Sequence, residues 1–116
     1  MSYLVNSSFG ADDPERATVP FILACSAANS AKTKVFLTGS ALRLVTKVQN
    51  TNVVAEGYTP VRDYIDEFVG KGGEIIICRV CANVMNITED DLIDGAVIGG
   101  APDTIAFLEA GAKVLH

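Results

Sequence analysis

Cys78 and Cys81, two cysteines separated by two residues, are the side chains of this sequence best suited to covalent chemistry. They follow the apolar run Ile75–Ile77, which is typical of a buried strand, and they stand where the next helix should begin. In α/β proteins, functional groups gather at the carboxyl ends of the strands. A helix N-terminus also lowers the pKa of a thiol and makes the reactive thiolate more abundant. The pair could act as a nucleophile, bind a metal ion or simply pack as small apolar side chains.

A structural zinc site would need about four ligands, and the sequence offers few beyond the C-x-x-C pair. The other candidates are Cys25, in the middle of an expected helix, and His116, the last residue of the sequence. We expect Cys25 to pack in the core and assign no role to His116. Neither a G-x-G-x-x-G nor a Walker pattern is present. We therefore expect no metal site within one chain and no cofactor, and ligands pooled from several subunits stay an alternative.

Two thiol chemistries remain. In the first, a thiolate takes up a sulfane sulfur and becomes a persulfide, which a second thiol can collect by exchange. Arg79, next to Cys78, would favour the anion, or would simply be a solvated surface charge. In the second, the two thiols form a reversible disulfide. In thioredoxins the motif follows an early strand and opens a long helix, whereas here it follows the third expected strand. That order disfavours a thioredoxin fold and leaves dithiol chemistry open.

The elements that must position these thiols alternate between strand and helix. We expect strands at residues 3–5, 34–38, 74–78, 96–98 and 112–115. We expect helices at 14–28, 61–69, 82–85 and 102–110, another from Gly39-Ser40 through Val48, a helical turn at 88–92 and an exposed loop at 49–57. Alternation with continuous apolar strands predicts an α/β fold. We expect a three-layer sandwich in which a mostly parallel sheet of about five strands carries helices on both faces.

Glycines follow several of the expected strands. Gly10, Gly39 and the pair Gly99-Gly100 each stand between a strand and a helix, so all should meet at the edge of the sheet that holds Cys78. Helix N-termini at such an edge offer backbone N–H groups to an anion, and ordinary turns use glycine as well. Asp13 is expected to cap the helix that begins at the following proline.

Composition restricts the class of protein. The 116-residue sequence has the length of one domain, residues 1–116, and is long enough to form a core without disulfides. Its net charge of −5, without clusters of Lys or Arg, argues against a nucleic-acid or anionic-membrane partner. The apolar fraction is 49%, yet no stretch is long enough to span a membrane. We attribute the apolar excess to buried strands or to surface buried between subunits. Because no secretion signal is recognisable, we expect a cytoplasmic protein with reduced thiols.

Segments at residues 10–18, 35–44, 78–92 and 111–114 resemble those of the DsrE/DsrF-like family, whose members have the YchN-like fold. The resemblance implies a three-layer α/β architecture that assembles as a homotrimer or homohexamer. It also implies a role in sulfur relay, with one persulfide-forming cysteine at the end of a strand. Counted back from Ile87, Cys78 takes that position, and Cys81 matches a second cysteine that some members carry.

We interpret the chain as a small cytoplasmic sulfur carrier, or sulfurtransferase-like protein, that forms a persulfide on Cys78 with Cys81 as the resolving thiol. Its partners would be sulfur donor and acceptor proteins or small sulfane-sulfur compounds, with no nucleic acid and no membrane. Two alternatives stay open. One is a non-enzymatic oligomeric module that holds a small ligand between subunits, and the other is a C-x-x-C dithiol redox protein.

Overall fold

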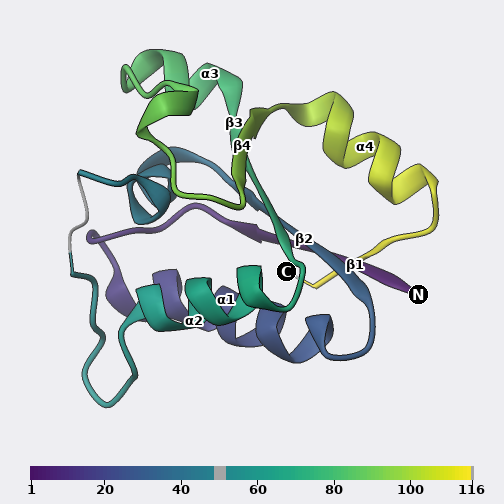
Figure 1. Ribbon diagram of the computed structural model, residues 1–116, viewed down its shortest axis with the longest axis horizontal. Coiled ribbons are helices and arrows are strands. Elements are labelled where there is room, and N and C mark those ends of the chain that lie inside the picture. Colours follow the sequence, from purple (N-terminus) through teal and green to yellow (C-terminus); the bar gives the residue numbers. More distant parts are fainter. Residues whose placement is uncertain (49–51, 116) are drawn as a thin grey trace.

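The computed structural model describes residues 1–48 and 52–115, and its centre is a five-stranded parallel sheet (Figure 1). The strand order is β4-β3-β2-β1-β5, and every pairing between these strands is parallel. The strands are β1 (Ser2–Ser7), β2 (Lys32–Leu37), β3 (Glu74–Cys78), β4 (Ala96–Gly99) and β5 (Lys113–Val114). The α/β fold with a parallel sheet of five strands, predicted from the alternation of strands and helices, is confirmed.

Helices connect the strands in the expected order. They are α1 (Pro14–Ala28), α2 (Val61–Gly70), α3 (Arg79–Val84) and α4 (Ala101–Glu109), with 3-10 helices η1 (Gly39–Val45) and η2 (Glu89–Asp91). The capping role expected for Asp13 is confirmed, because its Oδ1 accepts a hydrogen bond of 3.2 Å from the backbone N–H of Arg16. Among the described residues, no helix has both the length and the apolar character that crossing a membrane requires.

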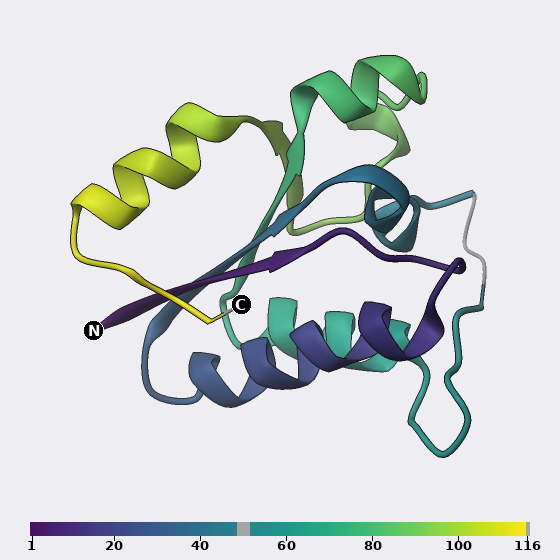
Figure 2. The same cartoon turned by 180° about the vertical axis from the view of Figure 1, so that it is seen from behind.

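The main core lies between the sheet and the helices α1 and α2, which cover one face side by side (Figures 1 and 2). Side chains alternate between the two faces of a strand, so Val35 of β2 and Ile75 of β3 point into this core and are fully buried. Phe21 of α1 and Phe68 of α2 meet edge to face, with ring centroids 6.4 Å apart. Burial of these apolar side chains holds the two helices on the sheet.

Helix α4 covers part of the opposite face (Figure 2). The alternation places Lys34 of β2 and Ile76 of β3 on this face. Phe107 of α4 is buried there, and the Nζ of Lys34 lies 4.8 Å from the centroid of its ring. The same Nζ lies 3.4 Å from a carboxylate oxygen of Glu74, which is the residue that pairs with Lys34 in the neighbouring strand. This face therefore mixes apolar packing with a partly buried charge.

Three local predictions are wrong in detail. The helix expected to run through Val48 ends at Val45, because Thr46 takes an extended conformation and forms an antiparallel bridge with Leu92. The helix expected at 82–85 begins at Arg79, directly after β3. The last strand is only two residues long, where four were expected.

The segment expected as an exposed loop at 49–57 is partly packed. Residues 49–51 lie outside the described part of the chain. Farther along, Val53 and Ala55 are buried, and the carbonyl oxygen of Val53 accepts a 3.0 Å hydrogen bond from the N–H of Val61 at the start of α2. The two small apolar side chains join the core instead of facing solvent, so the segment anchors the beginning of α2.

Candidate functional site

Cys78 is both the last residue of β3 and the N-cap of α3. Its backbone is extended, with φ −62° and ψ 123°, and it pairs in register with Gly99 of β4. Because α3 begins at the next residue, no loop separates the thiol from the first N–H groups of the helix. The side chain is only partly buried, so reagents can reach the sulfur. The placement of this cysteine at a strand end and helix start agrees with the sequence prediction.

The surroundings of the Cys78 sulfur favour its thiolate form. Partial burial is the largest single influence and raises the pKa. Three hydrogen bonds act in the opposite direction, from the N–H of Cys81, the thiol of Cys81 and the N–H of Val80, and together they outweigh burial. Donors that point at a sulfur stabilise its negative charge. The net effect is a pKa for Cys78 below the ordinary value of a thiol.

Cys81 lies one helical turn after Cys78, and its sulfur accepts a 3.4 Å hydrogen bond from the backbone N–H of Gly39. The Cys81 sulfur thus accepts a hydrogen bond from the residue that follows the end of β2, and Cys81 is also one of the groups that lower the pKa of Cys78. Gly39 adopts φ +55°, a left-handed conformation that glycine takes without strain. The structure therefore places the two predicted thiols in one helical turn and adds the N–H group of Gly39 to the site. In the sequence, the only indication of this N–H group was the position of Gly39 directly after a strand.

The predicted meeting of the glycine turns at one edge is confirmed. A Cβ atom on Gly10 would lie 2.5 Å from the carbonyl oxygen of Ser40, so the turn after β1 packs directly against the start of η1. Gly99 pairs with Cys78 across the sheet, and Gly39 contacts Cys81. The close approach of these turns fixes the backbone around the two thiols.

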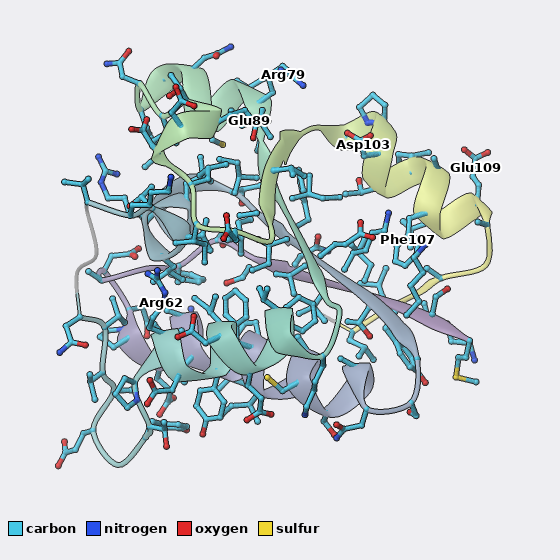
Figure 3. All side chains as sticks on the ribbon, in the orientation of Figure 1. Arg62, Arg79, Glu89, Asp103, Phe107 and Glu109 are labelled. Atoms are coloured by element: carbon cyan, nitrogen blue, oxygen red, sulfur yellow. The ribbon has the colours of Figure 1, made fainter. Side chains whose placement is uncertain are left out.

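Of the two roles that the sequence suggested for Arg79, the structure shows the solvated surface charge. Its side chain is exposed on α3 and points away from the sheet (Figure 3). The hydrogen bonds that lower the pKa of Cys78 come from Val80 and Cys81 instead. Asp103 lies at the start of α4 and accepts a 2.8 Å hydrogen bond from the N–H of Gly100, so its carboxylate caps that helix.

Cys25 is a core residue, as predicted. It is 4% exposed, and its thiol donates a 3.1 Å hydrogen bond to the carbonyl oxygen of Tyr64. Burial, with the nearby carboxylate of Glu67, raises the pKa of this thiol to about 11. Within residues 1–48 and 52–115, no group of three or more His, Cys, Asp or Glu side chains is arranged to hold a metal ion. His116, to which we assigned no role, lies outside the described residues.

A sequence model of the DsrE/DsrF-like family matches residues 1–116 of the chain. An uncharacterized protein of Methanocaldococcus jannaschii is 26% identical over 107 residues, which are 91% of this chain. The chain spans 38% of the length of that relative, so the relative contains much additional sequence.

Two solved structures share the architecture of the whole chain. The YchN protein of E. coli superposes with a TM-score of 0.78 at 22% identity, over 99% of this chain and 98% of that one. A protein of unknown function from Methanobacterium thermoautotrophicum superposes with a TM-score of 0.71 at 14% identity, over 98% and 96% of the two chains. At these identities the similarity establishes the fold.

The opposite pKa shifts of Cys78 and Cys25 predict how these two thiols react as the pH changes. Alkylation by iodoacetamide requires the thiolate, so Cys78 should react at a lower pH than an ordinary thiol. Cys25 should stay unlabelled in the folded protein, because it is buried and its pKa is raised to about 11. Site-resolved mass spectrometry of alkylation rates across pH measures both profiles. The same protein unfolded in urea is the control, and a Cys78 profile centred at or above its unfolded profile would contradict the prediction.

Proposed function

We propose, because this chain belongs to the DsrE/DsrF-like family, that it is a sulfur carrier whose persulfide forms on Cys78. The family is linked to sulfur relay. The observation that carries the assignment to this residue is the place of Cys78, which ends β3 and directly precedes α3, where Val80 and Cys81 lower the pKa of its thiol. A partly buried thiol with a lowered pKa at the end of a strand has the properties that a carrier nucleophile needs.

The loading step moves a sulfane sulfur from a donor persulfide, R–S–SH, to Cys78. The Cys78 thiolate attacks the outer sulfur of the donor, the S–S bond of the donor breaks, and the donor leaves as the thiolate R–S⁻. A new S–S bond forms on Cys78, whose persulfide holds the transferred sulfur. The transfer is an exchange between thiols, so it consumes no external oxidant or reductant.

The lowered pKa serves the unloading step as well. When an acceptor nucleophile attacks the outer sulfur of the persulfide, Cys78 is the leaving group, and a thiol of lower pKa leaves faster. Val80 and Cys81, by lowering the pKa of Cys78, therefore favour its thiolate in both steps, as the nucleophile during loading and as the leaving group during unloading. A sulfur donor and an acceptor, either proteins or small sulfane-sulfur compounds, are the partners that this cycle requires.

Cys81 provides a second route for unloading. Its thiolate can attack the inner sulfur of the persulfide, the Sγ of Cys78, and break the bond to the outer sulfur. The products are a Cys78–Cys81 disulfide and hydrosulfide, and a dithiol reductant must then restore the two thiols. The position of Cys81 in the first turn of α3, three residues after Cys78, supports this resolving role. The same pair supports the dithiol redox alternative, which would form the disulfide without carrying sulfur.

Incubation with sodium polysulfide, followed by peptide mass spectrometry, tests the carrier function. We expect the mass of one sulfur atom on the peptide that contains Cys78, and none in Cys78→Ser. In Cys81→Ser we expect the added sulfur to persist longer, because the internal attack is lost. Cys25→Ser is the matched control, since it removes a buried thiol outside the site.

Two outcomes would contradict the carrier function. One is equal uptake of sulfur by wild-type protein and Cys78→Ser. The other is rapid formation of a Cys78–Cys81 disulfide with no persulfide at any time, which would support the redox alternative.

We propose further that the carrier acts in the cytoplasm as a homotrimer or homohexamer. Several large apolar side chains are exposed, including Val80 and Val84 on α3, at 70% and 78%, and Ile105 on α4. Exposed apolar side chains are often buried in contacts between subunits.

Sedimentation velocity tests the assembly. We expect wild-type protein to sediment as a trimer or a larger species, and Val84→Glu to shift it toward the monomer. Val54→Glu is the control, because Val54 is also exposed and apolar but lies before α2. A wild-type monomer at all concentrations would contradict the proposal.

A further inference from the structure

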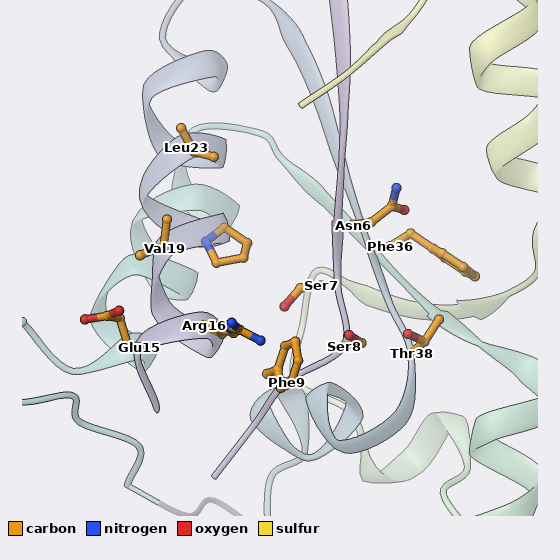
Figure 4. Close-up of a pocket in the computed structure, with 11 residues that line it drawn as sticks. Asn6, Ser7, Ser8, Phe9, Glu15, Arg16, Val19, Leu23, Phe36 and Thr38 are labelled. Carbon is orange, nitrogen blue, oxygen red and sulfur yellow. The ribbon is translucent and has the colours of Figure 1, made fainter. Parts of the chain in front are cut away.

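A half-open cavity of about 680 Å³ extends around the free edge of β1, from α1 on one face of the sheet to Phe36 and Thr38 on the other, and its lining includes neither Cys78 nor Cys81 (Figure 4). The cavity exists because β5 pairs with β1 only at Tyr3 and Leu4, so the later part of β1 has an open edge. Small-molecule sites usually have volumes of roughly 300–1,000 Å³. The size of this cavity is thus that of a ligand site.

A buried hydroxyl without a partner lies in the lining. Ser7 is only 6% exposed, and among the described residues its Oγ is the one buried side-chain oxygen or nitrogen that makes no hydrogen bond. The side chain points into the space between β1 and α1 (Figure 4). A buried polar atom without a partner costs free energy, which a ligand oxygen or N–H at this place would recover.

The rest of the lining combines an apolar wall with one cationic group. Val19 and Leu23 of α1 lie on the helix side of the cavity (Figure 4). The guanidinium of Arg16 lies 5.4 Å from the centroid of the Phe9 ring and points toward Ser7, whereas the carboxylate of Glu15 points away (Figure 4). An apolar wall next to a few converging polar groups is the usual composition of a small-molecule site.

The charges around the cavity favour a neutral occupant. The guanidinium of Arg16 has two carboxylates near it, because its Nε lies 3.7 Å from a carboxylate oxygen of Asp13 and Glu15 also lines the cavity, so the local charge is close to balanced. The chain as a whole carries a net charge of −5, which repels anions. A neutral molecule would still accept hydrogen bonds from the guanidinium.

We propose that this cavity binds a small neutral organic molecule. Its apolar body lies against Val19, Leu23 and Phe9, and one oxygen atom hydrogen-bonds the hydroxyl of Ser7 and the guanidinium of Arg16. An additional peptide strand at the β1 edge fits these observations less well. Such a strand would pair with backbone groups in the plane of the sheet, and it would leave the Ser7 hydroxyl, which points toward α1, without a partner.

Three aromatic probes of one shape test the site, namely benzyl alcohol, benzoate and benzylammonium. Titrations followed by amide NMR shifts should show benzyl alcohol binding at residues 7–9 and 16–23 more tightly than either charged probe. Ser7→Ala should weaken benzyl alcohol about fivefold, the effect expected for one neutral hydrogen bond. Leu23→Trp should abolish binding by filling the cavity. Ser26→Ala, an exposed position on the same helix, should bind like wild-type protein.

Thermal unfolding provides a readout that does not depend on a ligand. Ser7→Ala removes the unpartnered hydroxyl, so its unfolding midpoint should lie above that of wild-type protein in the absence of a probe.

Three results of the NMR titrations would overturn the proposal. They are equal binding of benzyl alcohol by Ser7→Ala and Ser26→Ala, tighter binding of benzoate than of benzyl alcohol, and no change in the amide shifts of the cavity residues. If the amide NMR shifts of the cavity residues change when the protein is diluted without any probe, a second copy of the chain covers the site, and this result would also overturn the proposal. None of these measurements involves Cys78, so they stand apart from the test of sulfur transfer.

Discussion

The parallel register of β2, β3 and β4 is the constraint on which the rest of the structure depends. It pairs Leu37 with Ile77 and Cys78 with Gly99, so the three strands end at one edge. The register is held by burial, because Ile75 and Ile77 pack into the core under α1 and α2. A slip of β3 by one residue would turn these side chains to the other face and carry Cys78 away from its neighbours. The apolar core thus determines where the thiol lies.

At that edge, short backbone connections determine which groups surround the two thiols. Because β3 passes directly into α3, the N–H groups of Val80 and Cys81 follow Cys78 in the first turn of the helix and lower the pKa of its thiol. The end of β2 contributes the N–H of Gly39, which binds the sulfur of Cys81. Backbone donors cannot be removed by replacing a side chain, and they move only if the strands move. We therefore attribute most of the lowering of the Cys78 pKa to the backbone at this edge. The thiol of Cys81 is the one contribution that a side-chain substitution can remove.

Much of this arrangement could be predicted from residue patterns. The run Ile75–Ile77 is apolar because both faces of β3 are covered, so strand and cysteine position were recognisable together. Contacts between segments far apart in the sequence could not be predicted from residue patterns. The hydrogen bond from Gly39 to Cys81 joins residues 42 positions apart, and the sequence indicated only that Gly39 would lie at the same edge, not which side chain its N–H would contact. Thr46 ends η1 because it pairs with Leu92, and Val53 is buried because its segment packs at the start of α2. The cavity beside Ser7 depends on how far β5 extends, which its short apolar sequence leaves open.

The C-x-x-C segment lowers the pKa of the Cys78 thiol below the ordinary value, through the donors of Val80 and Cys81. The most direct measurement is an NMR titration of the Cys78 Cβ resonance in wild-type protein and in Cys81→Ala. The account predicts a lowered pKa in wild-type protein and a higher value in Cys81→Ala, because the variant loses the thiol donor and keeps the backbone donors. An unshifted pKa in wild-type protein, or identical titrations of the two proteins, would contradict it.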